Sequence, residues 1–379
     1  MENVSSSNSH KDISPKLRFS GFNGGWSTAT LGELGTFTKG ASLSKADIST
    51  EGNPFILYGE LYTTYKEVAT KIMRKTRKVV DNECLSRVGD VIIPTSGETP
   101  EEIATATCIM LPNVILAGDL NIYRNDTVDG RFISYIINHV VNGDISRIAQ
   151  GKSVVHIKAD ELAKIQIHFP AKGEQLKLLD LLRLLDTRIE KQSMLIENLK
   201  SYKRGVLSRI FSSIESKVHL SKISEYYSSN NTMATLENNG GNYPIYDAGG
   251  IAKYIDKFDF EKPYIAIIKD GSGVGRLQLC QAQSSIIGTL GAIFPIKCSV
   301  EYLFSVLQII DFRQFTTGMA IPHIYYKDYK NMLVPYPDET SRFKIAQIIS
   351  KLDSVIEREN NLLCTCLHLK ECLLQQLFI

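Results

Sequence analysis

The chain has 379 residues, which is long enough for two or three domains with cores of their own. Its 43 lysines and arginines nearly balance its 41 aspartates and glutamates, which excludes a global attraction to polyanions, so any nucleic-acid face has to be local. The seven cysteines lack the spacing of a disulfide framework, the polar N-terminus lacks the apolar core of a signal peptide, and no apolar run is long enough to cross a bilayer. A soluble protein of the reducing cytoplasm is therefore expected.

The first part of the chain is predicted to form a tail and one domain. Residues 1–15 are rich in serine and asparagine and are expected to be disordered. Residues 16–170 carry short β-type runs that glycine, proline and asparagine interrupt at short intervals. This texture is typical of an irregular, β-rich α/β domain, in which only residues 131–140 are predicted to form a short helix.

A long helix is predicted over residues 171–212, because apolar side chains recur there at alternating spacings of four and three. Such spacing keeps them on one seam of a slightly underwound helix, which then needs a partner helix. The predicted interface residues of this helix are Leu178, Leu182, Leu185, Ile189, Ile196 and Leu199.

The pattern then restarts. Residues 213–337 again read as a β-rich domain, with a helix predicted over 300–310, and a second long helix follows over 338–379. The predicted interface residues of the second helix are Ile345, Ile349, Leu352, Ile356, Leu363 and Leu373.

The restart is an internal repeat. The segment 151–157 recurs at 318–324, and this offset of 167 residues holds without a gap to Phe211 and Phe378. The offset between Leu31 and Leu220 is 189, so the first β-rich domain is about 22 residues longer than the second. A solitary amphipathic helix on a core would not explain a duplicated seam, whereas two helices of one chain that pair with each other would. Two unlike domains on matched helices are predicted.

Several segments of the chain, taken together, are characteristic of one family. They are Pro15-Lys16-Leu17-Arg18-Phe19, Gly25-Trp26, Leu31-Gly32-Glu33, Val88-Gly89-Asp90-Val91, Tyr243-Pro244-Ile245-Tyr246, Lys269-Asp270-Gly271-Ser272 and the two junctions in which a proline precedes a long helix with Leu-Asp and Ile-Glu. In this order, from about residue 15 to 379, the chain resembles the specificity (S) subunits of type I restriction-modification enzymes.

The resemblance implies two target recognition domains, each reading one half of a split double-stranded DNA target. Two long helices would pair antiparallel as a spacer and dock two methyltransferase (M) subunits, and restriction (R) subunits would join that core. S-adenosylmethionine, ATP and Mg²⁺ would then belong to the partner subunits, with no cofactor on this chain. One departure is that the usual Glu-Gln of the helix start is Glu174-Gln175 in the first copy but Ser341-Arg342 in the second, so one partner could dock asymmetrically.

An antiparallel pair makes specific predictions about the polar residues of the seam. Paired centre to centre, the helices would bring Gln192 near Glu359 and Asn361, as a polar layer that fixes register. Lys203 and Lys370 would lie toward opposite ends, with their ammonium groups in water.

Four segments are candidates for contact with DNA. The loop after residues 90–94 offers small hydroxyls to base edges, the glycine-rich residues 271–275 lie between cations that suit phosphate, and residues 71–78 are the most basic run. In residues 151–153, Lys152 is a candidate for phosphate in one half-site only, because the equivalent position in the second copy is Met319. The alternatives are an ordinary polar loop, a plain hairpin turn and a solvated edge, and a structural role is expected for the matched His156 and His323. The predicted DNA-binding residues are Lys71, Arg74, Lys75, Thr95, Ser96, Gly97, Thr99, Lys152, Ser153, Lys269, Asp270, Gly271, Ser272 and Arg276.

No catalytic or metal-binding residue is predicted. Asn53-Pro54-Phe55 lacks the second proline of the adenine-methyltransferase loop, and residues 271–275 fit neither the dinucleotide fingerprint nor the phosphate loop. Cys364, His368 and Cys372 share one helix face, which rarely delivers four metal ligands. The sequence favours a non-catalytic DNA-specificity subunit. The alternative is a coiled-coil adaptor that binds proteins and no DNA, and a fused methyltransferase is disfavoured.

Overall fold

The computed structural model describes residues 13–151, 154–232, 240–318 and 321–379. The chain divides into two compact units, of which unit 1 ends at Glu190 and resumes with Cys364–Ile379, and unit 2 is Lys191–Leu363. We call residues 16–170 domain 1 and residues 213–337 domain 2. Among the described residues, no helix is both long and apolar enough to cross a membrane.

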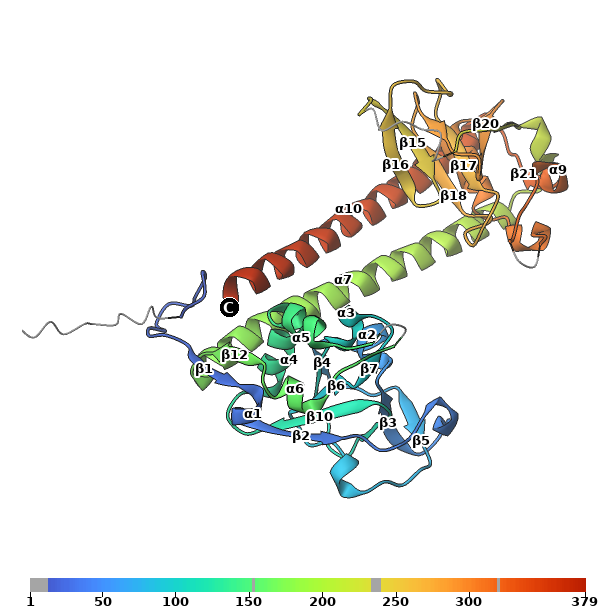
Figure 1. Cartoon of the computed structure of the whole chain (residues 1–379). Helices are drawn as coiled ribbons and strands as arrows, with labels where there is room; N and C mark the ends of the chain where they lie inside the picture. The colour runs from blue at the N-terminus through green and yellow to red at the C-terminus, as the bar shows by residue number, and fades with distance from the viewer. Residues whose placement is uncertain (1–12, 152–153, 233–239, 319–320) are drawn as a thin grey trace, which may run out of the picture. The chain divides into compact units, whose positions relative to one another are not determined.

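Domain 1 is built on a five-stranded sheet in the order β2-β10-β6-β8-β4. Figure 1 labels β2, β10, β6 and β4 of this sheet. One face packs against the helix α4, and the other face carries a second apolar cluster around Ile92 and Ile122. A three-stranded sheet, β5-β3-β9, and two two-stranded sheets, β1-β12 and β11-β7, complete the domain. The strands are β1 (Ser27–Thr30), β2 (Gly35–Lys39), β3 (Asn53–Leu57), β4 (Val68–Ala69), β5 (Arg74–Thr76), β6 (Asp90–Pro94), β7 (Ser96–Gly97), β8 (Thr107–Ile109), β9 (Ile115–Ala117), β10 (Leu120–Asn125), β11 (Val155–His156) and β12 (Gln166–Phe169).

The helices of domain 1 are short. They are α1 (Leu31–Leu34), α2 (Glu60–Thr63), α3 (Pro100–Ile103), α4 (Gly130–His139), α5 (Asn142–Ile148) and α6 (Ala159–Leu162), with single 3-10 turns at Lys45–Asp47 and Asn82–Cys84. The α4 helix lies within one residue of the predicted range, 131–140. Asp129 caps its start by accepting a hydrogen bond from the Arg131 N–H.

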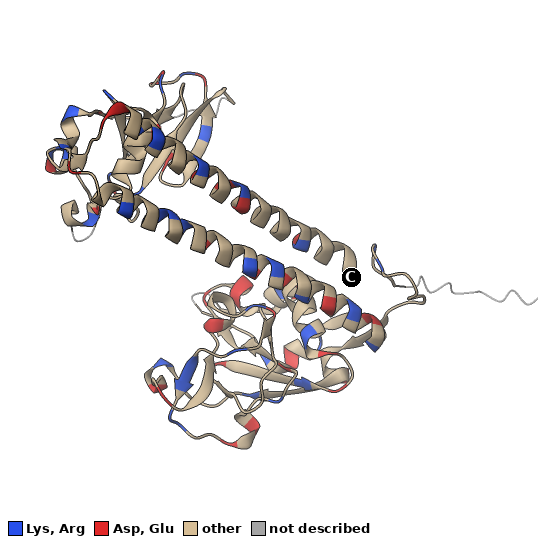
Figure 2. Ribbon diagram, turned by 180° about the vertical axis from the view of Figure 1, so that it is seen from behind, with Lys and Arg blue, Asp and Glu red and all other residues tan. Residues whose placement is uncertain are grey.

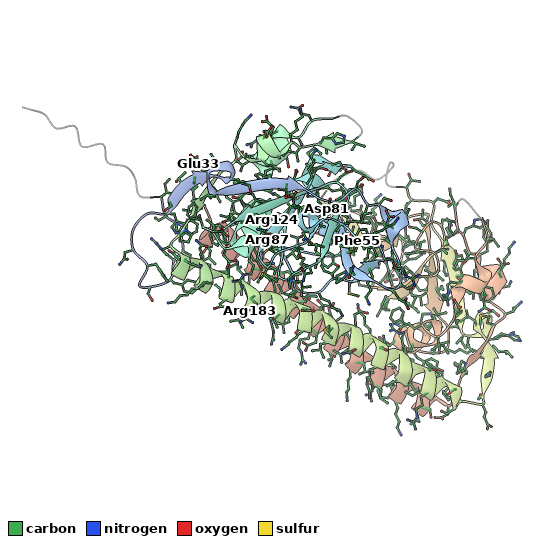
Figure 3. All side chains as sticks on the ribbon, turned by 90° about the horizontal axis from the view of Figure 1, so that it is seen from below. Glu33, Phe55, Asp81, Arg87, Arg124 and Arg183 are labelled. Carbon is green, nitrogen blue, oxygen red and sulfur yellow. The ribbon has the colours of Figure 1, made fainter. Side chains whose placement is uncertain are left out.

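A hydrogen bond and an ion pair of Asp90 stabilise the Gly89-Asp90 turn at the start of β6. Asp90 is buried, accepts a hydrogen bond from the Arg87 backbone N–H at 2.9 Å, and forms an ion pair with the Arg124 guanidinium at 3.1 Å. Arg87 and Arg124 are labelled in Figure 3. Gly89 adopts a φ of +97°, a conformation that favours glycine. The short Val-Gly-Asp-Val signature is therefore a structural turn at the entry to the central strand.

Domain 2 repeats the central part of this architecture. Its four-stranded sheet has the order β14-β20-β17-β18, so β14, β20 and β17 correspond to β2, β10 and β6 with the same antiparallel pairing. The strands are β13 (Lys217–His219), β14 (Ser224–Ser228), β15 (Tyr243–Asp247), β16 (Gly250–Ile255), β17 (Tyr264–Ile268), β18 (Leu277–Cys280), β19 (Ser285–Ile286), β20 (Leu290–Pro295) and β21 (Leu333–Pro335). The helices are α8 (Val300–Leu307) and α9 (Tyr326–Tyr329), with 3-10 turns at Leu220–Lys222 and Phe312–Phe315.

The two long helices, α7 (Lys172–Ser212) and α10 (Glu339–Leu377), pack against each other within each unit. In unit 1, Leu178 and Leu182 of α7 share a core with Leu374 of α10. In unit 2, Leu207 of α7 shares a core with Ile345 of α10. The start of each helix therefore meets the end of the other, so the pair is antiparallel. Of the predicted interface residues, Leu178, Leu182, Ile189, Ile196, Ile345 and Ile349 are buried, and Leu185, Leu199, Leu352, Ile356, Leu363 and Leu373 are half-buried.

The polar residues of the seam pair across the two helices. The Gln192 amide donates to the carbonyl and the carboxylate of Glu359, at 3.0 and 2.8 Å, which confirms the predicted contact between these two residues. The prediction that Lys203 and Lys370 reach water is wrong, because their side chains are only 10 % and 11 % exposed. Lys203 binds Asp353 at 2.5 Å and Lys370 binds Asp186 at 2.7 Å, so an aspartate on the facing helix replaces water in both cases. Both contacts obey the 167-residue offset.

Candidate nucleic-acid interface

In domain 1, the loop after the central strand is tied to the segment that precedes α6 and α7. The short strand β7 pairs antiparallel with β11, and the Ile157 N–H donates to the Thr95 carbonyl at 3.0 Å. Thr95 in turn donates its N–H to the Asp119 carbonyl at 2.7 Å, at the start of β10. These backbone contacts hold the loop in one place at the end of a rigid sheet.

Domain 2 holds its own loop in the same way. The Ile324 N–H donates to the Lys269 carbonyl at 2.9 Å, and the Lys269 N–H donates to the Thr289 carbonyl at 2.9 Å, at the start of β20. Asp270 forms a backbone bridge with His323, as Ser96 does with His156. The two loops selected from the sequence are therefore structural equivalents, and each contacts the matched histidine segment.

The predicted residues of the first loop differ in exposure. Thr95 borders an open groove of about 1450 Å³ in domain 1. Ser96 and Gly97 are buried, and the Ser96 hydroxyl donates to the Asp119 carboxylate at 3.0 Å. The Thr99 hydroxyl caps α3 by accepting from the Glu102 N–H. Of these four residues, only Thr95 faces the groove.

The basic run contributes one residue to the same groove. Arg74 lines it, but its guanidinium is bound to the buried Glu60 carboxylate at 2.7 Å. Lys71 and Lys75 are exposed and do not line it. Lys152 and Ser153 lie outside the described residues.

In domain 2 the glycines shape the loop. Gly271 and Gly275 adopt φ values of +100° and +83°, and a Cβ on Gly275 would lie 2.7 Å from the Phe312 Cβ. The Gly271 N–H donates to the Pro322 carbonyl at 2.9 Å, so in this conformation it does not serve a phosphate. The Arg276 guanidinium donates to the Ala248 carbonyl at 2.6 Å.

The cationic and acidic groups of this loop lie close together. The Lys269 ammonium lies 3.9 Å from the Asp270 carboxylate, and both side chains are partly exposed. Ser272 lies beside them in the same turn and is exposed.

The groove of domain 1 also contains residues that no sequence motif marks as candidates. Among them are Lys39, Lys45, Tyr58, Asp119, Asn121 and Lys158. They come from four separate segments, which only the fold brings together. Asn121 alone has a local signal, because it is an amide in the otherwise apolar run Leu120–Tyr123 of β10.

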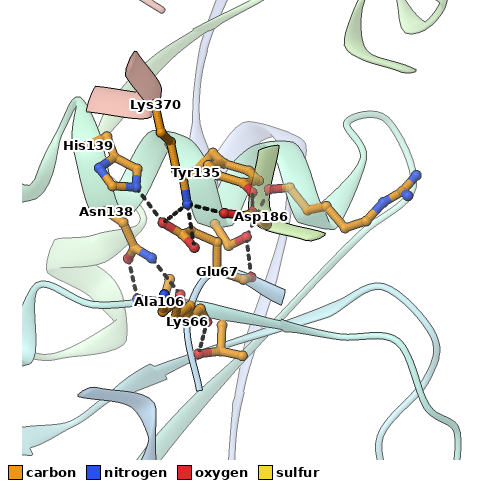
Figure 4. A network of polar contacts seen from close by, with 11 residues as sticks. Lys66, Glu67, Ala106, Tyr135, Asn138, His139, Asp186 and Lys370 are labelled. Carbon is orange, nitrogen blue, oxygen red and sulfur yellow. Dashed lines mark hydrogen bonds and ion pairs between the residues drawn. The ribbon is translucent and has the colours of Figure 1, made fainter. Parts of the chain in front are cut away.

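A buried polar network anchors domain 1 to both long helices within unit 1 (Figure 4). The Glu67 carboxylate contacts the His139 imidazole at 2.6 Å and the Lys370 ammonium at 3.4 Å. Lys370 also binds Asp186 of α7, which accepts a hydrogen bond from the Tyr135 hydroxyl at 2.5 Å. The network joins α4, α7 and α10 through side chains alone.

The network controls the ionisation of its members. Burial alone would raise the pKa of Glu67, but the His139 hydrogen bond and the Lys370 charge outweigh it and lower that pKa to about 2. Burial, together with the neighbouring Asp186 carboxylate, raises the pKa of the Tyr135 hydroxyl. The residues that the structure describes contain no group of histidines, cysteines and carboxylates placed to hold a metal ion, Cys364, His368 and Cys372 included.

The repeated domain, the paired loops and the antiparallel helices define a class of protein, in which two related β-rich modules are joined to one pair of long helices. The family model for the type I restriction modification DNA specificity domain matches residues 23–200 and again residues 216–364. The chain belongs to this family, and it is a DNA-specificity subunit with two recognition domains.

Solved structures agree with this fold. The S subunit of a type I restriction-modification system from M. genitalium superposes with a TM-score of 0.64 at 19 % identity, over 97 % of this chain and 99 % of that one. A chain from a study of complex assembly and conformational transition in the type I R-M system gives a TM-score of 0.56 at 15 % identity, over 93 % and 97 %. At these identities the likeness concerns the fold alone. The comparison with curated proteins gave no match.

Proposed function

We propose that this chain supplies the sequence specificity of a cytoplasmic type I restriction-modification complex and performs no chemistry itself. Each domain reads one half of a split double-stranded DNA target, while methyltransferase subunits dock on the long helices and restriction subunits join them. S-adenosylmethionine, ATP and Mg²⁺ are bound by those partners. The observation that carries the proposal is the double match to the specificity domain, on helices that repeat at a fixed offset.

The outer faces of the helices support docking of two partners. Leu195 and Tyr202 of α7 are 43 % and 62 % exposed, and the residues 167 positions later, Leu362 and Leu369 of α10, are 36 % and 48 % exposed. A spacing of seven keeps each pair on one helix face beside the seam. Apolar residues on that face suit an amphipathic helix from another chain, and their repetition suits two copies of it.

The first test measures DNA binding and methyl transfer. The purified chain should bind DNA with an affinity that falls steeply between two salt concentrations, because phosphate contacts release counterions. It should transfer no methyl group until methyltransferase subunits are added. Methyl transfer by the homogeneous chain alone would overturn the non-catalytic assignment, and an absence of DNA binding in the assembled complex would favour a protein-binding adaptor.

A second test separates the two domains. Residues 218–337 are exchanged for the same region of a related chain, and the methylated motif is read by sequencing the host genome. One half of the motif should change and the other should stay. A folded chimera that alters both halves would contradict independent recognition domains.

A third test concerns docking. Leu195→Lys and Leu362→Lys should each weaken co-purification with the methyltransferase subunit, because a charge would enter an apolar interface. Ser201→Lys, at an exposed polar site one residue from Tyr202, is the control and should leave co-purification intact. Equal retention of the partner by all three variants would exclude this face.

A further inference from the structure

Asn121 carries a buried side-chain amide in domain 1. It lies in β10, between the apolar residues Leu120 and Ile122, is 1 % exposed, and lines the groove of domain 1. Its Nδ2 has no hydrogen-bond acceptor among the described residues. Buried side-chain donors in folded proteins are nearly always partnered, so an unused donor at the wall of a groove points to a ligand.

The strand itself does not require an amide at this position. In domain 2 the equivalent residue of β20 is Gly291, and a Cβ there would come within 2.3 Å of the Tyr226 ring. An aromatic ring therefore fills in domain 2 the place that Asn121 occupies in domain 1. The two repeats share the strand and differ in the chemistry presented at this point, as two readers of different sequences would.

The charges of the groove suit base edges better than a run of phosphates. Its lining mixes cations, such as Lys39 and Lys158, with carboxylates, such as Glu98 and Asp119. Basic and acidic residues are likewise interspersed over the ribbon of domain 1 (Figure 2). A phosphate track would be repelled by the carboxylates, whereas base edges present both donors and acceptors.

We propose that Asn121 is a specificity-determining residue of domain 1. Its Nδ2 donates to an acceptor on a base edge of one half-site, such as guanine O6 or N7, adenine N7 or thymine O4. The carboxylates of the groove accept from exocyclic amino groups of neighbouring bases, and the lysines at its rim meet the backbone. This inference rests on the DNA-specificity function proposed above. It adds which residue of domain 1 contacts a base and that this residue is the hydrogen-bond donor.

The experiment compares the methylated motifs of cells that carry the complete system with wild-type chain, Asn121→Ala or Asn121→Asp. Asn121→Ala should relax one base position in one half of the motif, with a loss of discrimination of roughly 5- to 150-fold, the range of a good base contact. Asn121→Asp replaces the donor by an acceptor, so that position should now favour a base with an amino group, adenine or cytosine. The other half of the motif should not change.

Thr38→Val is the matched control. The Thr38 hydroxyl, on the neighbouring strand β2, is also buried and has no hydrogen-bond partner in the part of the chain that the structure describes, but Thr38 does not line the groove. This variant should leave both halves of the motif unchanged.

The outcomes separate the inference from the function on which it rests. If wild-type cells show no methylated motif, the proposed function fails. If they show one and both Asn121 variants reproduce it, Asn121 reads no base and the inference fails. Loss of both halves, with a lowered unfolding temperature of the purified variant, would make Asn121 a structural residue and would also overturn the inference.

Discussion

The first turn of each long helix donates a side-chain hydrogen bond to the proline carbonyl just before it. In α7 the donor is the Gln175 amide, at 2.8 Å from the Pro170 oxygen. In α10 the donor is the Arg342 guanidinium, at 2.6 Å from the Pro337 oxygen, and it also lies over the Tyr336 ring. The second copy therefore has Arg342 where the first has Gln175, and both side chains make the hydrogen bond to the preceding proline carbonyl.

The residue just before this donor is Glu174 in α7 and Ser341 in α10, and it makes different contacts in the two copies. Glu174 is 1 % exposed and binds Arg18 at 2.7 Å, inside unit 1. Its counterpart Ser341 donates its hydroxyl to Asp338 at 2.6 Å, and Asp338 in turn caps α10. At the first helix start the glutamate thus fastens the segment that precedes β1, which is a role inside the chain. Whether a partner docks asymmetrically stays a prediction.

A substitution at Arg342 tests the shared contact. Arg342→Gln should keep the hydrogen bond to Pro337 and lose only the stacking on Tyr336, at a cost of about 0.5–1 kcal/mol. Arg342→Leu should lose both and cost about 1–2 kcal/mol. The measurement is amide hydrogen exchange in the first turns of α10, with α7 of the same sample as the internal reference. Equal protection in the two variants would show that the contact adds nothing.

The lowered pKa of Glu67 predicts that the stability of unit 1 depends on pH. Its pKa is lowered from 4.5 to about 2, so its contribution to folding is complete above pH 4.5 and is lost as the pH falls toward 2. The shift corresponds to roughly 3 kcal/mol. Glu67→Gln should destabilise unit 1 by about that amount at pH 7, and the difference from wild type should shrink below pH 4.5. Hydrogen exchange of α4 as a function of pH is the measurement.

The control for Glu67→Gln lies in unit 2. Asp353→Asn removes the partner of Lys203, but the Asp353 side chain is 43 % exposed, so the loss should stay below about 1 kcal/mol. A pH-independent difference between wild type and Glu67→Gln would show that the carboxylate's charge is not what stabilises the network.

Among the elements, the long helices were the easiest to predict and the short strands the hardest. A seam of apolar residues over some forty positions is a local, periodic signal, and the bounds of α7 and α10 lie within a residue or two of those expected. Strands such as β4 and β7 have two residues each, and their existence depends on partners far away in the sequence. The order of the sheets could not be read for the same reason.

The candidate site followed the same rule. The loops at Thr95 and Lys269 were visible because small polar residues and glycines follow apolar strands. The groove was not visible, because it joins segments that lie apart in the chain. The burial of Lys203 could not be predicted, because its partner Asp353 belongs to the other helix. The spacing of apolar residues shows which side chains face the partner helix, but it does not show which polar residues pair across it.

The polar layer at Gln192 yields a prediction for the helix pair. Replacing both Gln192 and Glu359 by leucine should stabilise the pair, since apolar packing usually equals or exceeds a buried polar contact. The same change should loosen the register, because a polar layer penalises shifted alignments. Thermal unfolding should show a higher midpoint, while cysteine cross-linking across the seam should show more than one alignment. A single alignment in the double variant would mean that Lys203 and Lys370 suffice.

For the whole molecule, the spacer hypothesis predicts a change in the DNA target. Seven residues inserted after Ile196 and seven after Ile356 should lengthen both helices by about 10 Å. Gln192–Glu359 and Lys203–Asp353 each stay on one side of the insertions and keep their register. At about 3.4 Å per base pair, the preferred gap between half-sites should grow by roughly 3 base pairs.

Selection from a DNA library with random spacers measures that gap. Some loss of affinity is expected, because 3 base pairs turn the second half-site by roughly 100°. An insertion in α7 alone is the control: it shifts one helix past the other, so the protein should unfold more readily and select no new spacing. Undiminished binding of the double insertion at the original spacing would refute the hypothesis.

The core of domain 1 contains residues from the end of α10 and the residue that follows it, Phe378. Phe378 stacks on Phe132 at 5.1 Å between ring centroids, and Leu374 and Leu377 share the same core as Trp26. On the ribosome, domains generally fold in the order in which they emerge. Here the domain that is made first can close its core only after residues 191–363 have been made, whereas unit 2 is one continuous stretch. The part of the domain 1 core that Leu374, Leu377 and Phe378 cover must therefore stay exposed to solvent while domain 2 folds. A chain that stops before Phe378 leaves this apolar surface exposed for good.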